Sequence, residues 1–152
     1  MSNAESIGLR MITFHVRAVQ ANMYRVMQDL LTRMIGHDAS KLEPEELALV
    51  VGKSRLNSIA YGTPEYNAAL AEVKEAVDHH YSCNPHHPDY YDGGVSDMSL
   101  LDLLEMLCDW KAAAEENSST LAASIDTNVD RFDISKEMAA ILRKTAKDLG
   151  WI

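Results

Sequence analysis

The sequence predicts an all-α protein of about five main helices. Apolar residues recur at spacings of three and four over long stretches, and Ser, Thr or Pro precedes most of these stretches. No segment of useful length alternates apolar and polar residues as a strand would. A length of 152 residues, with 47% hydrophobic and 24% charged residues, fits one globular domain. We expect this domain to span residues 5–152, and residues 1–4 to be a remnant of an expression vector.

The first two helices are defined by where their apolar patterns start and stop. Apolar residues spaced by three and four predict a first helix over residues 6–34, which Gly36 interrupts. Pro44 suits the first turn of a second helix, because the N–H group that proline lacks would have no helical partner there. We expect this helix to run to about residue 60 and to end at Tyr61 and Gly62.

The third and fourth helices begin at residues that cap helices well. Thr63 predicts the start of a third helix, whose inward apolar stripe leads to His80. Ser99, with Asp102 three residues later, predicts the start of a fourth helix. This helix is apolar on nearly every side over residues 100–114, so we expect it to be the buried central helix.

The last part of the chain predicts one further helix. The segment 117–128 is polar and rich in small residues, which favours a loop or a frayed helix end. Ser135 then caps an amphipathic helix that ends at Gly150.

Charge and cysteine content narrow the classes of partner. The formal net charge is −9 and no basic run occurs, which argues against binding to a nucleic-acid duplex. No apolar run approaches the ~18 residues that span a bilayer, so we expect no membrane partner. Cys83 and Cys108 do not suggest a disulfide framework, and a cytoplasmic location is expected.

A first candidate site is the dipeptide His37-Asp38, followed by Lys41. An adjacent imidazole and carboxylate can both reach one metal ion, because each places a donor at the end of a short side chain. Alternatively, Asp38 or Ser40 caps the next helix and His37 lies on the surface.

A second candidate is the segment 78–94, which holds four of the six histidines of the chain. His80 continues an apolar stripe and is expected to point inward, whereas His79 is expected to point outward. His86 and His87 lie between two prolines, which stiffen the loop as a metal or phosphate site requires. Alternatively, His80 is a hydrogen-bonded core residue and the loop stacks its rings with nearby tyrosines on the surface.

A third candidate is the acidic face of the apolar helix, formed by Asp102, Glu105 and Asp109. The capping position explains Asp102. Glu105 and Asp109 lie deeper in the helix, and a buried carboxylate needs a cation or good hydrogen-bond donors. Either a metal ion or an arginine, such as Arg17 or Arg55, can supply this.

The order of these residues resembles the HD-domain superfamily of metal-dependent phosphohydrolases. HDASK is similar to the HDxGK motif of that superfamily, with Ser40 at the position of the usual glycine. The resemblance implies an HD-like helical fold in which His37, Asp38 and Asp109 are the core metal ligands and His15 is a fourth. It also implies that His80 and one of His86 or His87 complete or extend the site, and that Lys41 contacts a phosphate or the adjacent carboxylate.

Three further stretches are similar to a family of uncharacterised helical proteins from bacteria and phages. These stretches are HDASKLEPEE, NPHHPDYY and MSLLDLLEMLCDW, and the resemblance covers about residues 12–151. It implies a helical fold and no particular activity.

Helix geometry limits the role of His15. His15 and His37 are 22 positions apart, which in one unbroken helix is ~33 Å at 1.5 Å per residue. His15 is therefore a ligand only if the chain turns near Asn22 or Thr32.

The expected function is hydrolysis of a small phosphate ester, with a nucleotide as the default substrate class. The expected cofactor is one or two ions of Mn²⁺, Fe²⁺, Co²⁺, Ni²⁺ or Zn²⁺, which suit mixed imidazole and carboxylate donors and activate water. Glu105 is expected to orient an imidazole or the water, and Lys41 to neutralise developing charge.

Two alternatives remain. In the first, the chain is a helical binding or assembly protein with a structural His-rich loop, with or without metal. In the second, no metal is bound, and the histidines bind an anionic ligand or pack with one another through the tyrosines. Assembly would place NPHHPDYY in a subunit interface, whereas catalysis requires His37, Asp38 and Asp109 to converge beside a cleft.

Overall fold

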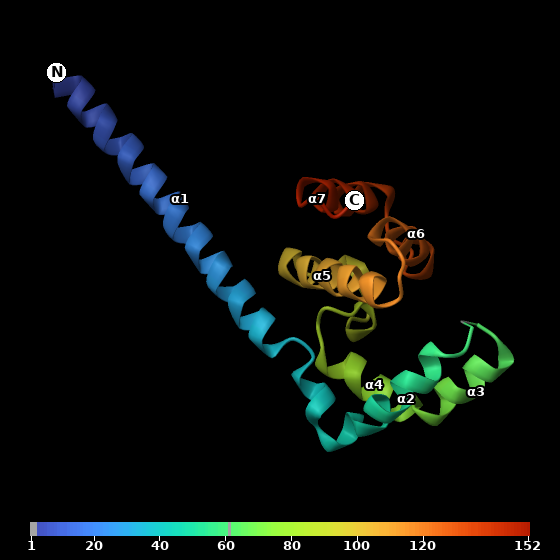
Figure 1. The fold of residues 1–152 in the computed structure, drawn as a ribbon. Helices are drawn as coiled ribbons and strands as arrows, with labels where there is room; N and C mark the ends of the chain where they lie inside the picture. Colours follow the sequence, from blue (N-terminus) through green and yellow to red (C-terminus); the bar gives the residue numbers. More distant parts are fainter. Residues whose placement is uncertain (1–2, 61) are drawn as a thin grey trace. The chain divides into compact units, whose positions relative to one another are not determined.

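The computed structural model describes residues 3–60 and 62–152, and these residues form α-helices, 3₁₀ turns and no strand (Figure 1). The all-α prediction is confirmed. The predicted helix end at Tyr61, and Met1 and Ser2 of the expected vector remnant, lie outside the described residues. The helices are α1 (Asn3–Gly36), α2 (Leu47–Asn57), α3 (Pro64–Glu72), α4 (Lys74–Cys83), α5 (Leu100–Glu116), α6 (Leu121–Arg131) and α7 (Lys136–Asp148). No described helix is long and apolar enough to cross a membrane.

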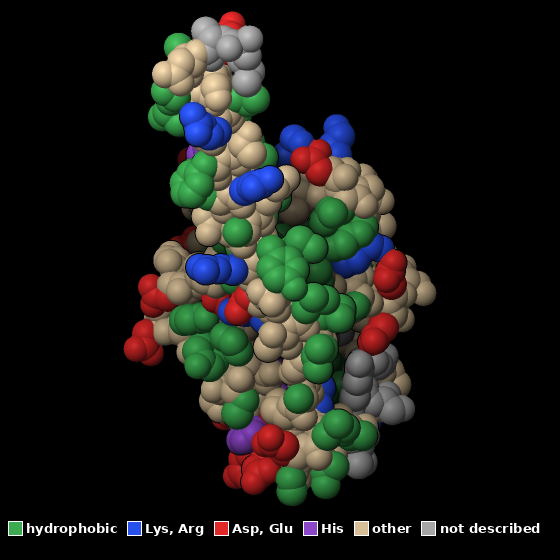
Figure 2. Space-filling model, turned by 90° about the vertical axis from the view of Figure 1, so that its left-hand side faces the viewer, with side chains coloured by type: hydrophobic (Ala, Val, Ile, Leu, Met, Phe, Trp, Pro, Cys, Tyr) green, Lys and Arg blue, Asp and Glu red, His purple; other side chains and the backbone are tan. Residues whose placement is uncertain are grey.

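The chain divides into two compact units, Met1–Gly36 and His37–Ile152. The first unit is α1, which runs without a break from Asn3 to Gly36. Apolar side chains are exposed along it, among them Phe14 and Met23 (Figure 2). A single helix has no core of its own, so the expectation of one domain over residues 5–152 stays a prediction.

The core of the second unit lies among α5, α6 and α7. Met106 and Leu107 of α5, Ile125 of α6 and Leu142 of α7 are all 4% exposed or less and belong to one hydrophobic cluster. The predicted burial of the fourth helix is therefore correct for one face of α5, whereas Leu100 and Cys108 are exposed. This core anchors α5, from which Glu105 and Asp109 project.

The prediction of a loop over residues 117–128 is wrong, because α6 covers most of this segment. The side-chain oxygen of Thr120 accepts a hydrogen bond from the Ala123 N–H group and caps the helix. Leu121 and Ile125 lie four residues apart, so both face the core, where they are 2% and 0% exposed. Between them, Ala122 and Ala123 are exposed and Ser124 is half-buried.

The second and third predicted helices are each divided in two. Residues 44–46 form a 3₁₀ turn, η2 (Pro44–Glu46), before α2 begins. The predicted third helix breaks at Val73, which leaves helical geometry and separates α3 from α4. Val73 is buried where α2 approaches closely, because a Cβ atom at Gly52 would lie 2.7 Å from its Cγ1 atom. The break changes the direction of the chain between α3 and α4, and α4 carries His79 and His80.

Three 3₁₀ turns flank this helical group. η1 (Ala39–Leu42) follows His37-Asp38. After α4 comes the histidine loop, residues 84–99, which contains η3 (Pro88–Tyr90) and η4 (Gly94–Asp97). The loop ends at Ser99, where the predicted capping box is present. The Asp102 N–H group donates to Ser99 Oγ at 3.2 Å, and the Ser99 N–H group donates to Asp102 Oδ2 at 2.8 Å.

Replacing Ser99 by alanine is expected to lower the free energy of unfolding by about 1 kcal/mol, because the first turn of α5 loses its cap. Urea unfolding of the variant and the wild type measures this. Ser82 is exposed and does not cap a helix, so Ser82→Ala is the control. It should leave the free energy of unfolding within about 0.5 kcal/mol of the wild-type value. Equal stability of Ser99→Ala and wild type would contradict the assigned role.

Candidate metal centre

Asp38 lies in the turn between His37 and η1, with its backbone in the left-handed region at φ 56°. Aspartate tolerates this conformation better than most residues. Although Asp38 is at the capping position of η1, its side chain makes no capping hydrogen bond, so the capping alternative is wrong for Asp38. Its Oδ2 atom instead accepts a hydrogen bond from Lys41 Nζ. Lys41 therefore contacts the adjacent carboxylate, one of the two partners expected for it.

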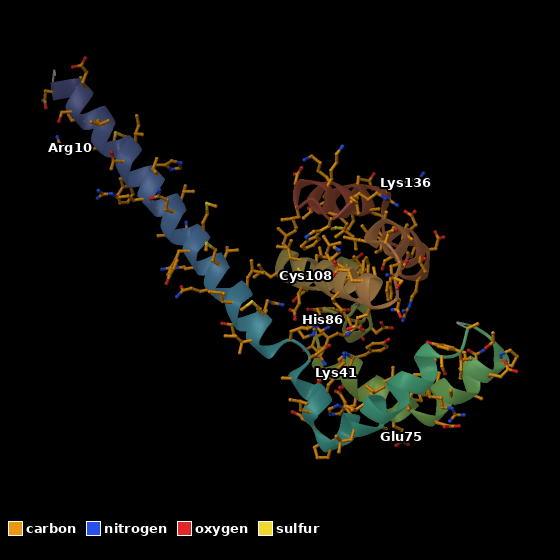
Figure 3. All side chains as sticks on the ribbon, in the orientation of Figure 1. Arg10, Lys41, Glu75, His86, Cys108 and Lys136 are labelled. Carbon is orange, nitrogen blue, oxygen red and sulfur yellow. The ribbon has the colours of Figure 1, made fainter. Side chains whose placement is uncertain are left out.

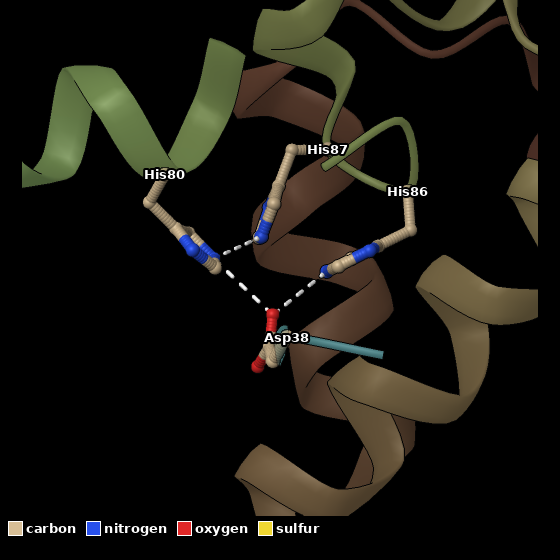
Figure 4. A group of neighbouring side chains, drawn as sticks. All are labelled: Asp38, His80, His86 and His87. Atoms are coloured by element: carbon tan, nitrogen blue, oxygen red, sulfur yellow. Dashed lines mark hydrogen bonds and ion pairs between the residues drawn. The ribbon is translucent and has the colours of Figure 1, made fainter. Parts of the chain in front are cut away.

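Three histidines converge on the other oxygen of Asp38 (Figure 4). His80 Nε2 lies 3.4 Å and His86 Nε2 lies 3.5 Å from Asp38 Oδ1. His87 Nε2 lies 2.9 Å from His80 Nε2. His80 comes from α4, and His86 and His87 come from the loop that follows it, between α4 and α5 (Figure 3). We call Asp38, His80, His86 and His87 the histidine group.

The spacing of these donors fits one metal ion. Two ligand atoms bound at about 2.1 Å to the same ion are roughly 3.0–3.4 Å apart in octahedral or tetrahedral geometry. The three distances in the histidine group, 2.9, 3.4 and 3.5 Å, are close to this range. Asp38 Oδ1 and His86 Nε2 are also buried without a hydrogen-bond partner. Buried polar atoms are normally paired, so these two point to a missing ligand.

A second group of donors uses the other side of Asp38. His37 Nε2 lies 3.5 Å from Asp38 Oδ2 and 3.9 Å from Asp109 Oδ1. We call His37, Asp38 and Asp109 the carboxylate group; its donor atoms all lie within 4.8 Å of one another. Asp38 is thus placed between two sets of donors, with one oxygen toward each. This arrangement suits two ions bridged by one carboxylate.

Glu105 contacts imidazoles in both groups. Its Oε1 atom lies 2.9 Å from His37 Nδ1 and 3.3 Å from His86 Nδ1. Because a carboxylate only accepts hydrogen bonds, neutral His37 and His86 carry their hydrogens at Nδ1 and present the Nε2 lone pair. A carboxylate that orients metal-binding histidines in this way is common in metal sites. Of the arginine alternatives, Arg55 pairs instead with Glu72, at 2.5 Å.

Glu46 is a site residue that the sequence pattern does not reveal. Its side chain is 0% exposed. Its Oε1 and Oε2 atoms lie 2.9 Å from the Nδ1 atoms of His79 and His80, respectively. Hydrogen bonds from His79, Ser40 and His80 outweigh the effect of burial and hold the pKa of Glu46 below its usual value. Glu46 thus fixes His80 with its Nε2 atom toward Asp38, as Glu105 fixes His37 and His86.

The expectation that His79 points outward is wrong. Its side chain is 29% exposed and is held by Glu46. In a helix that continued through Val73, His79 would share an outward face with Glu72. Val73 leaves helical geometry, so Glu72 belongs to α3 and His79 to α4.

The histidine loop is not a surface loop. His86 is 1% exposed and Pro88 is buried, whereas Asp89, Tyr90, Asp92 and Gly93, further along the loop, are exposed. The expected ring stacking occurs, but in part inside the unit: the His86 and His87 ring centroids are 4.2 Å apart and those of Tyr81 and His87 are 4.8 Å apart.

Burial lowers the pKa values of His86 and His87 and so keeps both imidazoles uncharged near neutral pH. Burial and the neighbouring imidazoles His86 and His80 lower the pKa of His87 to about 3. Burial also lowers the pKa of His86, as does the nearby His37. Burial alone would raise the pKa of Asp38, but the hydrogen bond and charge of Lys41 hold that pKa below its usual value. Near neutral pH the site therefore combines neutral imidazoles at His86 and His87 with an ionised carboxylate at Asp38, the forms that bind metal ions.

The metal-free protein is expected to lose stability when the pH falls from 7 to 5. The unfolded chain protonates His87 around its ordinary pKa of 6.5, whereas the folded chain does not until about pH 3. His87 alone accounts for about 2 kcal/mol of lost stability over this window, because the unfolded state binds the extra proton. Urea unfolding with a chelator at both pH values measures the loss, which should be about 2 kcal/mol smaller in His87→Gln. An identical loss in the variant would contradict this assignment.

His15 does not join this cluster through a turn in the chain. α1 contains no break near Asn22 or Thr32, so His15 and Gly36 are about 31 Å apart along one helix. Gly36 directly precedes His37, and an ion beside His37 is therefore beyond the reach of His15 in the same chain. The remaining predicted ligands, His37, Asp38, His80, His86, His87 and Asp109, come together, and their binding of metal stays a prediction.

Comparison with known proteins gives one match. No curated protein and no solved structure is detectably similar to this chain. A family described as a family of unknown function, DUF5662, matches residues 5–148. The match covers nearly the whole chain and agrees with the predicted resemblance to an uncharacterised family. The chain belongs to this family of unknown function, DUF5662.

Proposed function

We propose that this protein is a divalent-metal-dependent phosphohydrolase of HD-like type that acts on small phosphate esters. The observation that carries the proposal is the pair of buried, unpartnered atoms, Asp38 Oδ1 and His86 Nε2, at the point where the imidazoles converge. A buried donor atom that no other protein group pairs with by a hydrogen bond is an expected feature of a metal ligand.

The donor set favours a transition metal. The histidine group offers three imidazoles and one carboxylate, and the carboxylate group offers one imidazole and two carboxylates. Mixed nitrogen and oxygen donors suit Mn²⁺, Fe²⁺, Co²⁺, Ni²⁺ or Zn²⁺ better than ions that prefer only oxygen. When bound, such an ion polarises a phosphoryl oxygen and lowers the pKa of a coordinated water molecule.

Glu46, Glu105 and Lys41 would orient the ligands and balance charge. Glu46 and Glu105 hold the imidazoles with their Nε2 atoms toward the donors' common centre. The Lys41 ammonium group neutralises one oxygen of Asp38 and is 40% exposed, so it can also meet the negative charge of a phosphate group. Lys41 thus provides a positive charge at the edge of the cluster.

The difference in exposure between the two groups favours catalysis over a closed structural site. The side chains of His80 and His86 are 6% and 1% exposed, whereas those of His37 and Asp109 are 31% and 27% exposed. An ion in the carboxylate group would therefore have room for a solvent or substrate ligand, which a catalytic metal needs. The alternative of an assembly protein that presents NPHHPDYY at an interface has less support, because His86 and Pro88 are buried within their own chain.

The test compares hydrolysis of a phosphate monoester by Mn²⁺-loaded wild-type protein and by the Asp109→Asn variant. Asp109→Asn should lower kcat by about 100-fold or more while an ion is retained in the histidine group, because the group open to substrate loses a ligand. Glu115→Gln, on the same helix and 65% exposed, is the control and should keep wild-type kcat. No hydrolysis of any monoester by metal-loaded wild type, or equal kcat in Asp109→Asn, would overturn the proposal.

A further inference from the structure

A pocket adjoins the histidine group, and the proposed chemistry gives no role to the apolar part of it. Its volume is about 430 Å³, within the range of small-molecule sites, and α2, α3 and α4 line it together with Lys41 and His87. It shares three residues with the site, Lys41, His80 and His87. One end of the pocket is thus formed by cationic and metal-binding groups.

The rest of the pocket is apolar. Its other lining residues are aliphatic, such as Leu56 and Val77, or aromatic, namely Tyr66 and Tyr81. Among its described lining residues there is no carboxylate, amide, serine or threonine. Apart from the two phenol hydroxyls, this end offers no side-chain group for hydrogen bonds to a sugar or to the edge of a base.

We propose that this pocket binds the organic part of the substrate, and that the substrate is a phosphate monoester of an apolar alcohol. The inference rests on the proposed function and narrows it. The phosphate would lie beside Lys41, which lines the pocket and contacts Asp38 Oδ2, the oxygen that faces the carboxylate group. An alkyl or aryl group would fill the space beside Leu56 and Val77. Hydroxyl groups of a sugar phosphate, or the polar edge of a nucleobase, would lose hydrogen bonds to water there and find few replacements. Apolar groups gain from leaving water.

The first experiment compares monoesters that have similar leaving groups but different organic parts. Metal-loaded protein is assayed with n-hexyl phosphate, glycerol 3-phosphate and adenosine 5′-monophosphate, all esters of aliphatic hydroxyl groups. The expected kcat/KM for n-hexyl phosphate exceeds the other two by about tenfold or more. Equal values for the three esters, or a preference for either polar ester, would overturn the inference while leaving the phosphohydrolase intact.

A substitution in the pocket tests whether the pocket causes the preference for n-hexyl phosphate over glycerol 3-phosphate. Leu56→Asn should raise KM for n-hexyl phosphate by about tenfold and leave KM for glycerol 3-phosphate unchanged, because only the alkyl group contacts this wall. The matched control is Ile59→Asn, three residues further along, at a position that does not line the pocket. An equal change in KM for both esters would contradict the assigned contact.

Direct binding separates this inference from the proposed function. Metal-free protein is titrated with n-hexyl phosphate and with glycerol 3-phosphate while the methyl NMR signals of Leu56 and Val77 are followed. Shifts with n-hexyl phosphate alone support the pocket even if no ester is hydrolysed, in which case only the phosphohydrolase proposal fails. No shifts with n-hexyl phosphate would overturn the pocket assignment whatever the activity.

Discussion

Replacing Asp38 by alanine is expected to remove metal binding from both donor groups. The two oxygens of Asp38 face different sets of donors, so one substitution takes a ligand from each. In wild-type protein, a metal ion at 100 times its dissociation constant should raise the free energy of unfolding by about 2.7 kcal/mol. In Asp38→Ala the same addition should raise it by close to zero.

Thermal or urea unfolding with and without Mn²⁺ or Zn²⁺ measures this difference. Asp89→Ala is the matched control, because Asp89 is an exposed aspartate in the histidine loop and belongs to neither donor group. The control should keep the full wild-type stabilisation. Equal stabilisation of Asp38→Ala and wild type would show that the ion binds elsewhere.

Replacing Glu46 by alanine is expected to affect both folding and metal affinity. The substitution leaves the Nδ1–H groups of His79 and His80 without their acceptor in a buried site, and we expect a loss of about 3–5 kcal/mol in the free energy of unfolding. It also frees the His80 ring to rotate, so metal affinity should fall by about 10–100-fold. Urea unfolding and calorimetric metal titration measure the two effects.

Glu46→Gln separates the two effects, because it keeps the volume of the side chain. Each carboxylate oxygen of Glu46 faces a different imidazole, so in Glu46→Gln the carbonyl oxygen faces one ring and the NH₂ group faces the other. The ring that faces the NH₂ group, His79 or His80, must present its Nδ1 lone pair. The loss of stability should be smaller than for Glu46→Ala, and ¹⁵N NMR should show a changed tautomer in one of the two rings. The exposed neighbour Glu45 gives the control Glu45→Gln. Wild-type tautomers and wild-type metal affinity in Glu46→Gln would contradict the role of Glu46.

Helix starts could be predicted from the sequence because capping is a local property. Thr63, Ser99 and Ser135 each accept a hydrogen bond from the N–H group three residues later, as their positions before apolar stretches predict. Helices whose positions depend on contacts with the core are harder to predict. α6 was missed because its core contacts depend on a few apolar residues spaced by four within a segment of small polar residues.

The candidate site could be predicted only in part, for a related reason. His37, Asp38, His80, His86, His87 and Asp109 are visible in the sequence as residue types that bind metal, and their order resembles a known superfamily. Glu46 is separated from His79 and His80 by 33 and 34 positions, and no local pattern marks it. Its burial follows from the way α4 packs on η2, which the spacing of residues does not encode. The same packing brings the Nδ1 atom of His79 to Glu46, although the sequence predicts that His79 points outward.

The most direct test of the metal centre is the metal content of purified, untagged protein, measured by elemental mass spectrometry without added metal. We expect about one or two equivalents of a transition metal, in line with the two donor groups that share Asp38. Asp38→Ala, purified in the same way, should contain close to none. Absence of metal from wild-type protein, even after incubation with Mn²⁺, Ni²⁺ or Zn²⁺, would show that the histidine cluster is a structural feature and not a metal centre.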